Sequence, residues 1–121
     1  MNEQKSLEVI KAIEKNDINM VKFYIDNGYP LNGVKCEIYN YLEYQSTFDP
    51  DEIPEIIYEN QPLIESIFRQ NIKLVKLLLE NGANPGLPGM TFDNALEIAK
   101  CTENEEIIKV IKAHLIKSSI V

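Results

Sequence analysis

The chain has 121 residues, of which 45% are hydrophobic and 26% are charged, and these proportions fit a single folded domain, residues 1–121. No apolar run approaches the roughly 18 residues of a membrane-spanning helix, and the first residues lack the apolar core of a signal peptide, so we expect a cytoplasmic protein without membrane contact. The net charge of −7 argues against nucleic acid as a partner, because phosphate binding requires clustered Lys and Arg.

Residues 5–32 are predicted to form a first repeat unit, a pair of short helices. Ala12 and Ile13 supply the apolar face of the first helix, and Val21 lies in the second. Gly28 is expected to end the unit, because glycine adopts a left-handed conformation at low steric cost.

Residues 33–61 hold most of the net charge. They contain seven acidic residues and one base, a balance of −6, whereas the remaining residues hold twelve acids and eleven bases, a balance of −1. Four of the six tyrosines also lie here. Apolar residues at helical spacing predict two short helices, over residues 36–44 and 53–57, so we expect a folded, acidic, helical segment.

Residues 62–85 form the clearest repeat unit. Pro62 suits the first turn of a helix, where its missing N–H would have no partner. A polar turn at Gln70 and Asn71 separates this helix from a second one with an aliphatic stripe. Gly82 is expected to end the second helix, as Gly28 does in the first unit.

Residues 94–117 are predicted to form a terminal capping unit. Asn94 followed by Glu97 has the spacing of a helix capping box. The unit lacks the glycine of the other two and ends in a tail that contains lysine and serine.

The three units align with one another at a regular period. The aligned positions form an aliphatic column and a lysine column: Val21, Val75 and Ile108, then Lys22, Lys76 and Lys109. Val75 and Ile108 are 33 positions apart, whereas Val21 and Val75 are 54 positions apart. The first interval is therefore longer by 54 − 33 = 21 residues. Residues 33–61 are therefore either a degenerate repeat or a true insertion.

Residues 62–85 resemble an ankyrin repeat, both in their opening Pro-Leu and in the run Val-Lys-Leu-Leu-Leu-Glu-Asn-Gly-Ala-Asn. The resemblance implies an all-α fold, an ankyrin-repeat solenoid of helical hairpins with about three to four repeats and a helical, acidic insert between the first and second clear repeats. It also implies a protein-binding concave face formed by the connecting loops and the first helix of each hairpin. We expect the free protein to be a monomer.

No pattern in the sequence indicates an enzyme. His114 is the only histidine, and no carboxylate is placed to orient it. Asp49 begins an acidic run, but Ile53 and Pro54 stand where a calcium-binding loop needs a ligand and a glycine. We therefore expect no catalytic, metal or cofactor site and no cofactor, and we expect the two cysteines to be buried or half-buried thiols.

Two groups of residues are predicted to contact a protein partner. Aromatic residues and Arg dominate interface hot spots, and dense carboxylates favour a basic partner. The predicted contacts are Tyr39, Tyr44, Asp49, Asp51, Glu52, Glu55, Tyr58 and Glu59 in the acidic segment, and Phe68 and Arg69 in the repeat unit that follows. The alternatives are that Phe68 is covered by the acidic segment and that the carboxylates only face water.

Two functions follow from these expectations. The first is a binding module that neutralises a basic protein partner by occlusion, since a small acidic protein of this kind resembles the immunity proteins that block bacterial toxin domains. The second is a generic adaptor that scaffolds another protein through its concave face without inhibiting it.

Overall fold

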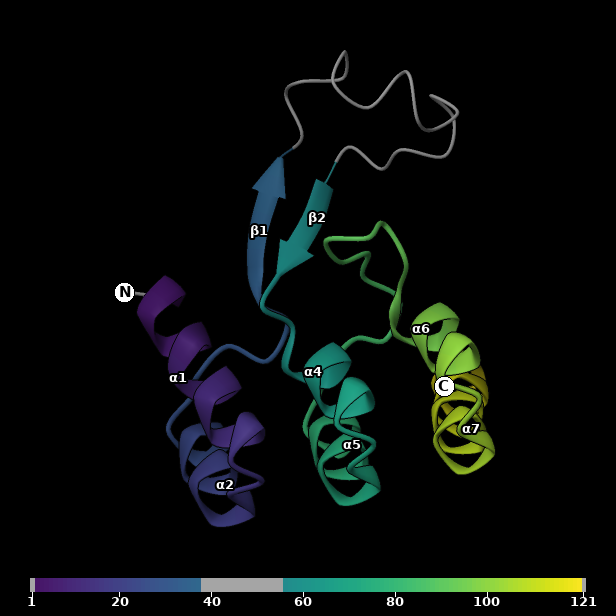
Figure 1. The fold of residues 1–121 in the computed structure, drawn as a ribbon, viewed down its shortest axis with the longest axis horizontal. Coiled ribbons are helices and arrows are strands. Elements are labelled where there is room, and N and C mark those ends of the chain that lie inside the picture. Colours follow the sequence, from purple (N-terminus) through teal and green to yellow (C-terminus); the bar gives the residue numbers. More distant parts are fainter. Residues whose placement is uncertain (1, 38–55, 121) are drawn as a thin grey trace.

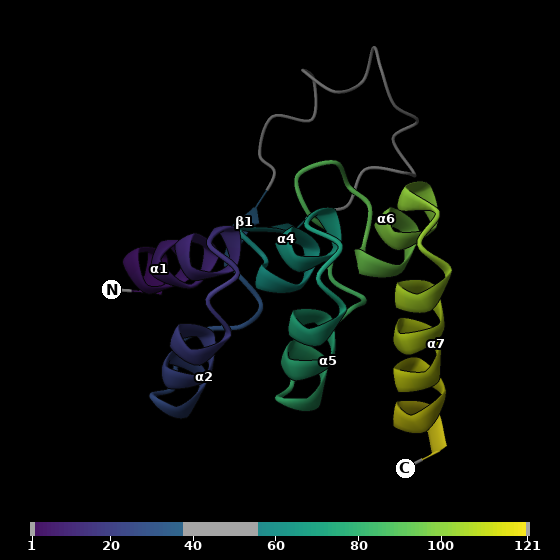
Figure 2. The same cartoon turned by 60° about the horizontal axis from the view of Figure 1, so that its bottom comes forward.

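The computed structural model describes residues 2–37 and 56–120 (Figure 1). This part of the chain contains six helices and two strands. In chain order they are α1 (Asn2–Glu14), α2 (Ile18–Asp26), β1 (Val34–Glu37), β2 (Ile56–Glu59), α4 (Pro62–Phe68), α5 (Ile72–Glu80), α6 (Ala95–Thr102) and α7 (Glu105–Ile120). The helices form three hairpins side by side, α1/α2, α4/α5 and α6/α7, so that α1, α4 and α6 make one layer and α2, α5 and α7 the other (Figure 2).

The connection between the two helices has the same conformation in all three hairpins. A residue with positive φ is followed by an Asn or Asp whose side chain accepts the backbone N–H three residues on, which caps the second helix. The positive-φ residues are Asn16, Gln70 and Glu103, and the capping residues are Asp17, Asn71 and Asn104. Because the capping residues are 54 and 33 positions apart, as are the aligned aliphatic residues, the turn chemistry repeats with the same period as the helices.

The core lies between the two helical layers and runs through all three hairpins. The aligned residues Val21 and Val75 are fully buried, and Ile108 is 8% exposed. The predicted helix ends of residues 62–102 are confirmed: Pro62 opens α4, Gly82 follows α5 with a φ of 101°, and Asn94 opens α6 with a complete capping box. None of the helices in the described ranges has the length and apolar character needed to cross a membrane.

The prediction of an all-α fold is wrong. β1 and β2 form an antiparallel pair in which Cys36 lies opposite Ile57 and Lys35 opposite Tyr58, so the fold is mixed. The isoleucines near residue 56 have helical spacing, but short apolar runs of β-branched and aromatic residues suit a strand equally well. Pairing with β1, which is distant in the sequence, decided between the two.

The prediction of two short helices within the acidic segment is wrong where the structure describes it, because these residues also pair as strands. Cys36 and Glu37, expected to begin a helix, end β1, and Ile56 and Ile57, expected in a second helix, begin β2. The rest of both predicted helices lies outside the described residues.

The strand pair is tied to the loop between α5 and α6, residues 81–94. The backbone N–H of Tyr58 donates to the carbonyl of Pro88 (2.8 Å), and Gln61 Nε2 donates to the carbonyl of Leu87 (3.0 Å). A third bond joins the backbone N–H of Asn84 to Asn32 Oδ1 (2.7 Å). The strand pair and this loop therefore rise together beside the layer of α1, α4 and α6 (Figures 1 and 2).

Candidate functional site

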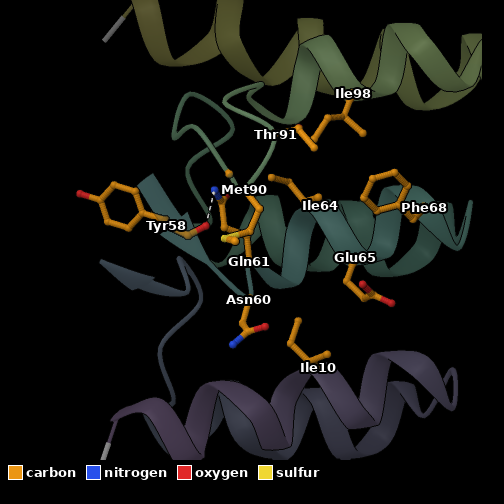
Figure 3. A pocket seen from close by; sticks show the side chains of 11 residues that line it. Ile10, Tyr58, Asn60, Gln61, Ile64, Glu65, Phe68, Met90, Thr91 and Ile98 are labelled. Carbon is orange, nitrogen blue, oxygen red and sulfur yellow. Dashed lines mark hydrogen bonds between the residues drawn. The ribbon is translucent and has the colours of Figure 1, made fainter. Parts of the chain in front are cut away.

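An open hollow of about 200 Å³ lies over α4, which we call the α4 groove (Figure 3). Its floor is built from one isoleucine of each helix in the layer: Ile10 of α1, Ile64 of α4 and Ile98 of α6. The three helices lie side by side because their buried faces share the same core. The groove thus crosses all three hairpins rather than lying within one.

Two large apolar side chains stand exposed at the rim of the α4 groove. Phe68, in the last turn of α4, is 58% exposed, and Met90, in the loop before α6, is 63% exposed. In Figure 3 Met90 lies over the middle of the groove and Phe68 at one end. Aromatic residues and Met are enriched at protein interfaces, and Phe and Met bury large area on contact.

Gln61 holds the Met90 loop against the groove. Gln61 is 4% exposed, and its side-chain amide donates to the carbonyls of Tyr58 and Leu87. Gly89 lies so close to the Ile64 side chain that a Cβ there would be 3.0 Å from its terminal carbon. The groove wall is therefore fixed by hydrogen bonds and close packing, which reduces the entropy lost when a ligand binds.

The structure places four of the ten predicted contact residues. Phe68 and Tyr58 both line the α4 groove, at opposite ends, with the Tyr58 ring pointing away from Phe68 (Figure 3). Arg69 follows directly after Phe68, and its Nε donates to Glu65 Oε1 at 3.1 Å. Glu59 lies on the other face of the strand pair from Tyr58, the face that carries Cys36. The remaining six, Tyr39, Tyr44, Asp49, Asp51, Glu52 and Glu55, lie outside the described residues.

Phe68 is exposed in the part of the chain that the structure describes, whereas most of the acidic segment, the alternative cover for Phe68, lies outside the described residues. Arg69 was also predicted to contact a partner, but in the structure it is paired with Glu65. Its guanidinium already has a carboxylate partner four residues earlier, on the same helix. Exposed pairs of this kind contribute little to stability, so Arg69 can exchange its partner at small cost.

Sequence reasoning missed Met90 and the three isoleucines of the floor. Ile64 could have been found, because it lies four residues before Phe68, which was predicted to contact a partner. Residues four apart share one face of a helix. No sequence signal indicated Met90, which reaches the groove only because the residue 81–94 loop folds back over α4.

The strand pair carries a shielded thiol, Cys36, on the face that it shares with Glu59. Its Sγ donates to the carbonyl of Val34 at 3.7 Å. Burial raises the pKa of the Cys36 thiol, and the Glu59 carboxylate adds to this effect because a thiolate beside a carboxylate is disfavoured. The other thiol, Cys101, is exposed, contrary to expectation.

We predict that Cys36 reacts with iodoacetamide more slowly than Cys101 at pH 8, since the thiolate is the reactive form and Cys36 is half-buried. Glu59→Gln should lower the pKa of Cys36 and speed its labelling by roughly threefold, while Cys101 serves as the internal reference. Pulsed labelling and mass spectrometry of the two peptides measure both rates. Equal rates, or no change in Glu59→Gln, would contradict the assigned environment of Cys36.

Among the described residues, no group of three or more His, Cys, Asp or Glu side chains is placed to hold a metal ion. A scan against protein-family models found no match, and a search of curated proteins found no similar sequence.

Proposed function

We propose that the chain is a protein-binding module whose partner docks in the α4 groove. The observation that carries this proposal is the pair of exposed side chains, Phe68 and Met90, beside an isoleucine floor to which three helices contribute. Monomeric proteins rarely expose large apolar side chains around a concave apolar surface unless something binds there. The resemblance of residues 62–85 to an ankyrin repeat supports the same conclusion.

The partner that fits this surface is basic. The groove rim carries the polar groups of Tyr58 and Asn60 and the Glu65 carboxylate, whose partner Arg69 is not among the lining residues; no other cation lines the groove in the described part of the chain. Residues 33–61, the segment that contains the strand pair, have a net charge of −6 in the sequence. Complementary charge accelerates the encounter with a basic partner and fixes its orientation.

Phe68→Ala is expected to weaken partner binding by about 2 kcal/mol, roughly thirtyfold in Kd, because it removes a hot-spot ring from the rim of the groove. The partner is first identified as a protein retained by immobilised wild-type chain and lost with Phe68→Ala, and its Kd is then measured by calorimetry. Phe23→Ala is the matched control, since Phe23 is 55% exposed on α2, outside the groove. If Phe68→Ala and Phe23→Ala weaken partner binding equally, or if only Phe23→Ala weakens it, the assignment of the groove is contradicted.

A second arm of the same experiment tests the basic partner. Replacing Asp49, Asp51, Glu52 and Glu55 by Asn or Gln should slow association and flatten its dependence on salt, while dissociation changes little. Neutralisation by occlusion, as in immunity proteins, then requires that the wild-type chain inhibits the activity of the captured partner. A partner that stays active when bound would favour the adaptor function instead.

A further inference from the structure

The outer face of the α1/α2 hairpin is a second apolar surface, distinct from the α4 groove. α1/α2 is at one end of the row of hairpins, and no other described element packs on its outer side (Figure 1). Met20 and Phe23 of α2 are 40% and 55% exposed there. We call this surface the end face.

Apolar residues of the end face occupy the same repeat positions as residues that are buried in the middle hairpin. The spacing of 54 positions that relates Val21 to Val75 places Met20 at the position of Leu74, and Tyr24 at the position of Leu78. Leu74 and Leu78 are fully buried, because the α4/α5 hairpin has a neighbour on each side. Met20 and Tyr24 instead line a shallow hollow between α1 and α2 on the end face. A terminal unit of a stack normally carries polar residues at such positions.

Three aromatic rings extend this apolar surface. Tyr24 stacks on Tyr29 with ring centroids 4.5 Å apart, and Phe23 meets Tyr24 edge to face at 5.9 Å. Lys5 Nζ lies 5.3 Å from the centroid of Tyr29. These contacts hold the rings in fixed positions, so little side-chain entropy remains to be lost when the surface is covered.

The charges on the end face differ from those of the rest of the molecule. Three lysines and two carboxylates surround the rings, which gives +3 − 2 = +1, whereas the whole chain carries −7 and the remainder therefore −8. The five residues are Lys5, Lys11 and Lys15 with Glu8 and Asp17. Two copies of the chain would repel each other strongly across an acidic surface, but less across this one, where the lysines of one copy can face the carboxylates of the other.

We propose that two copies of the chain associate through their end faces, related by a two-fold axis, in a dimer that leaves both α4 grooves open. In such a contact each copy covers Met20 and Tyr24 of the other, as a neighbouring hairpin covers Leu74 and Leu78 in the middle of the row. The exposed Phe23 ring, next to Tyr24 on α2, is covered with them. The sequence led us to expect a monomer, because the exposure of Met20 and Phe23 is not evident without the fold.

Sedimentation velocity over a concentration series is the test, with the intact chain. The wild type should shift reversibly from the mass of one chain towards twice that mass as its concentration rises. Phe23→Glu should raise the dimer dissociation constant by roughly tenfold or more, since it places a carboxylate in the apolar centre of the contact. Phe68→Glu is the matched control, because it makes the same change of an exposed ring in the α4 groove and should leave association unchanged.

Lys11→Glu with Lys15→Glu is a second variant that leaves the aromatic rings intact. It changes the charge of the end face from +1 to −3, so it should also weaken association, and added salt should partly restore it. Ile116→Glu, at an exposed apolar position of α7, separates the proposed dimer from head-to-tail stacking and should have no effect. A wild type that keeps the mass of one chain throughout, or association that Phe23→Glu leaves intact while Phe68→Glu or Ile116→Glu abolishes it, would overturn the proposal.

Discussion

Replacing Leu78 by alanine is expected to lower the free energy of unfolding by about 2–5 kcal/mol. Leu78 of α5 is fully buried in the core that runs through all three hairpins. The substitution removes its apolar contacts and leaves a cavity that neighbouring helices can fill only in part. Since a domain of this size is stable by about 5–15 kcal/mol, a large part of the total would be lost.

Chemical denaturation of Leu78→Ala, followed by circular dichroism, measures this loss. Leu77→Ala is the matched control, since Leu77 is the same residue type on the same helix and only half-buried, so its cost should be clearly smaller. Equal costs for Leu77→Ala and Leu78→Ala would mean that the core does not pass through α5 as described.

Replacing Gly33 by alanine is expected to cost about 2 kcal/mol or more and to loosen the strand pair. Gly33 has a φ of 77°, and a Cβ built on it would overlap the backbone carbonyl oxygen of Glu59. Left-handed strain in a non-glycine residue costs about 1–2 kcal/mol, and relief of the overlap requires β2 to move away from β1.

Gly28→Ala separates these two effects. Gly28 has a φ of 75°, almost the same as Gly33, but a Cβ there meets nothing within 4 Å, so this variant should show only the backbone strain. Chemical denaturation gives both stabilities, and the labelling rate of Cys36 reports locally on the strand pair. If Gly28→Ala and Gly33→Ala lose equal stability and Cys36 labels at the same rate in both, the close approach of Gly33 to Glu59 is not a constraint on the fold.

The candidate site was predicted in part. Phe68 was identified because the resemblance of residues 62–85 to an ankyrin repeat implies an outward position there, and because aromatic residues are common in interface hot spots. Met90 was missed, because its place at the groove depends on the hydrogen bonds from Gln61 and Tyr58 to the loop that carries it. Such contacts join parts of the chain that are distant in sequence, and no periodic pattern marks them.

The sequence by itself determined the helical hairpins. Helix positions, their ends at Gly28 and Gly82, and the capping box at Asn94 follow from contacts within a few residues, and the period of 33 positions repeats them. Only the tertiary structure decided that residues 34–37 and 56–59 are strands, because each strand is stabilised by backbone hydrogen bonds to a partner distant in sequence. It also decided which apolar side chains stay exposed, since Met20 and Leu74 occupy the same repeat position but only Leu74 has a neighbouring hairpin that covers it.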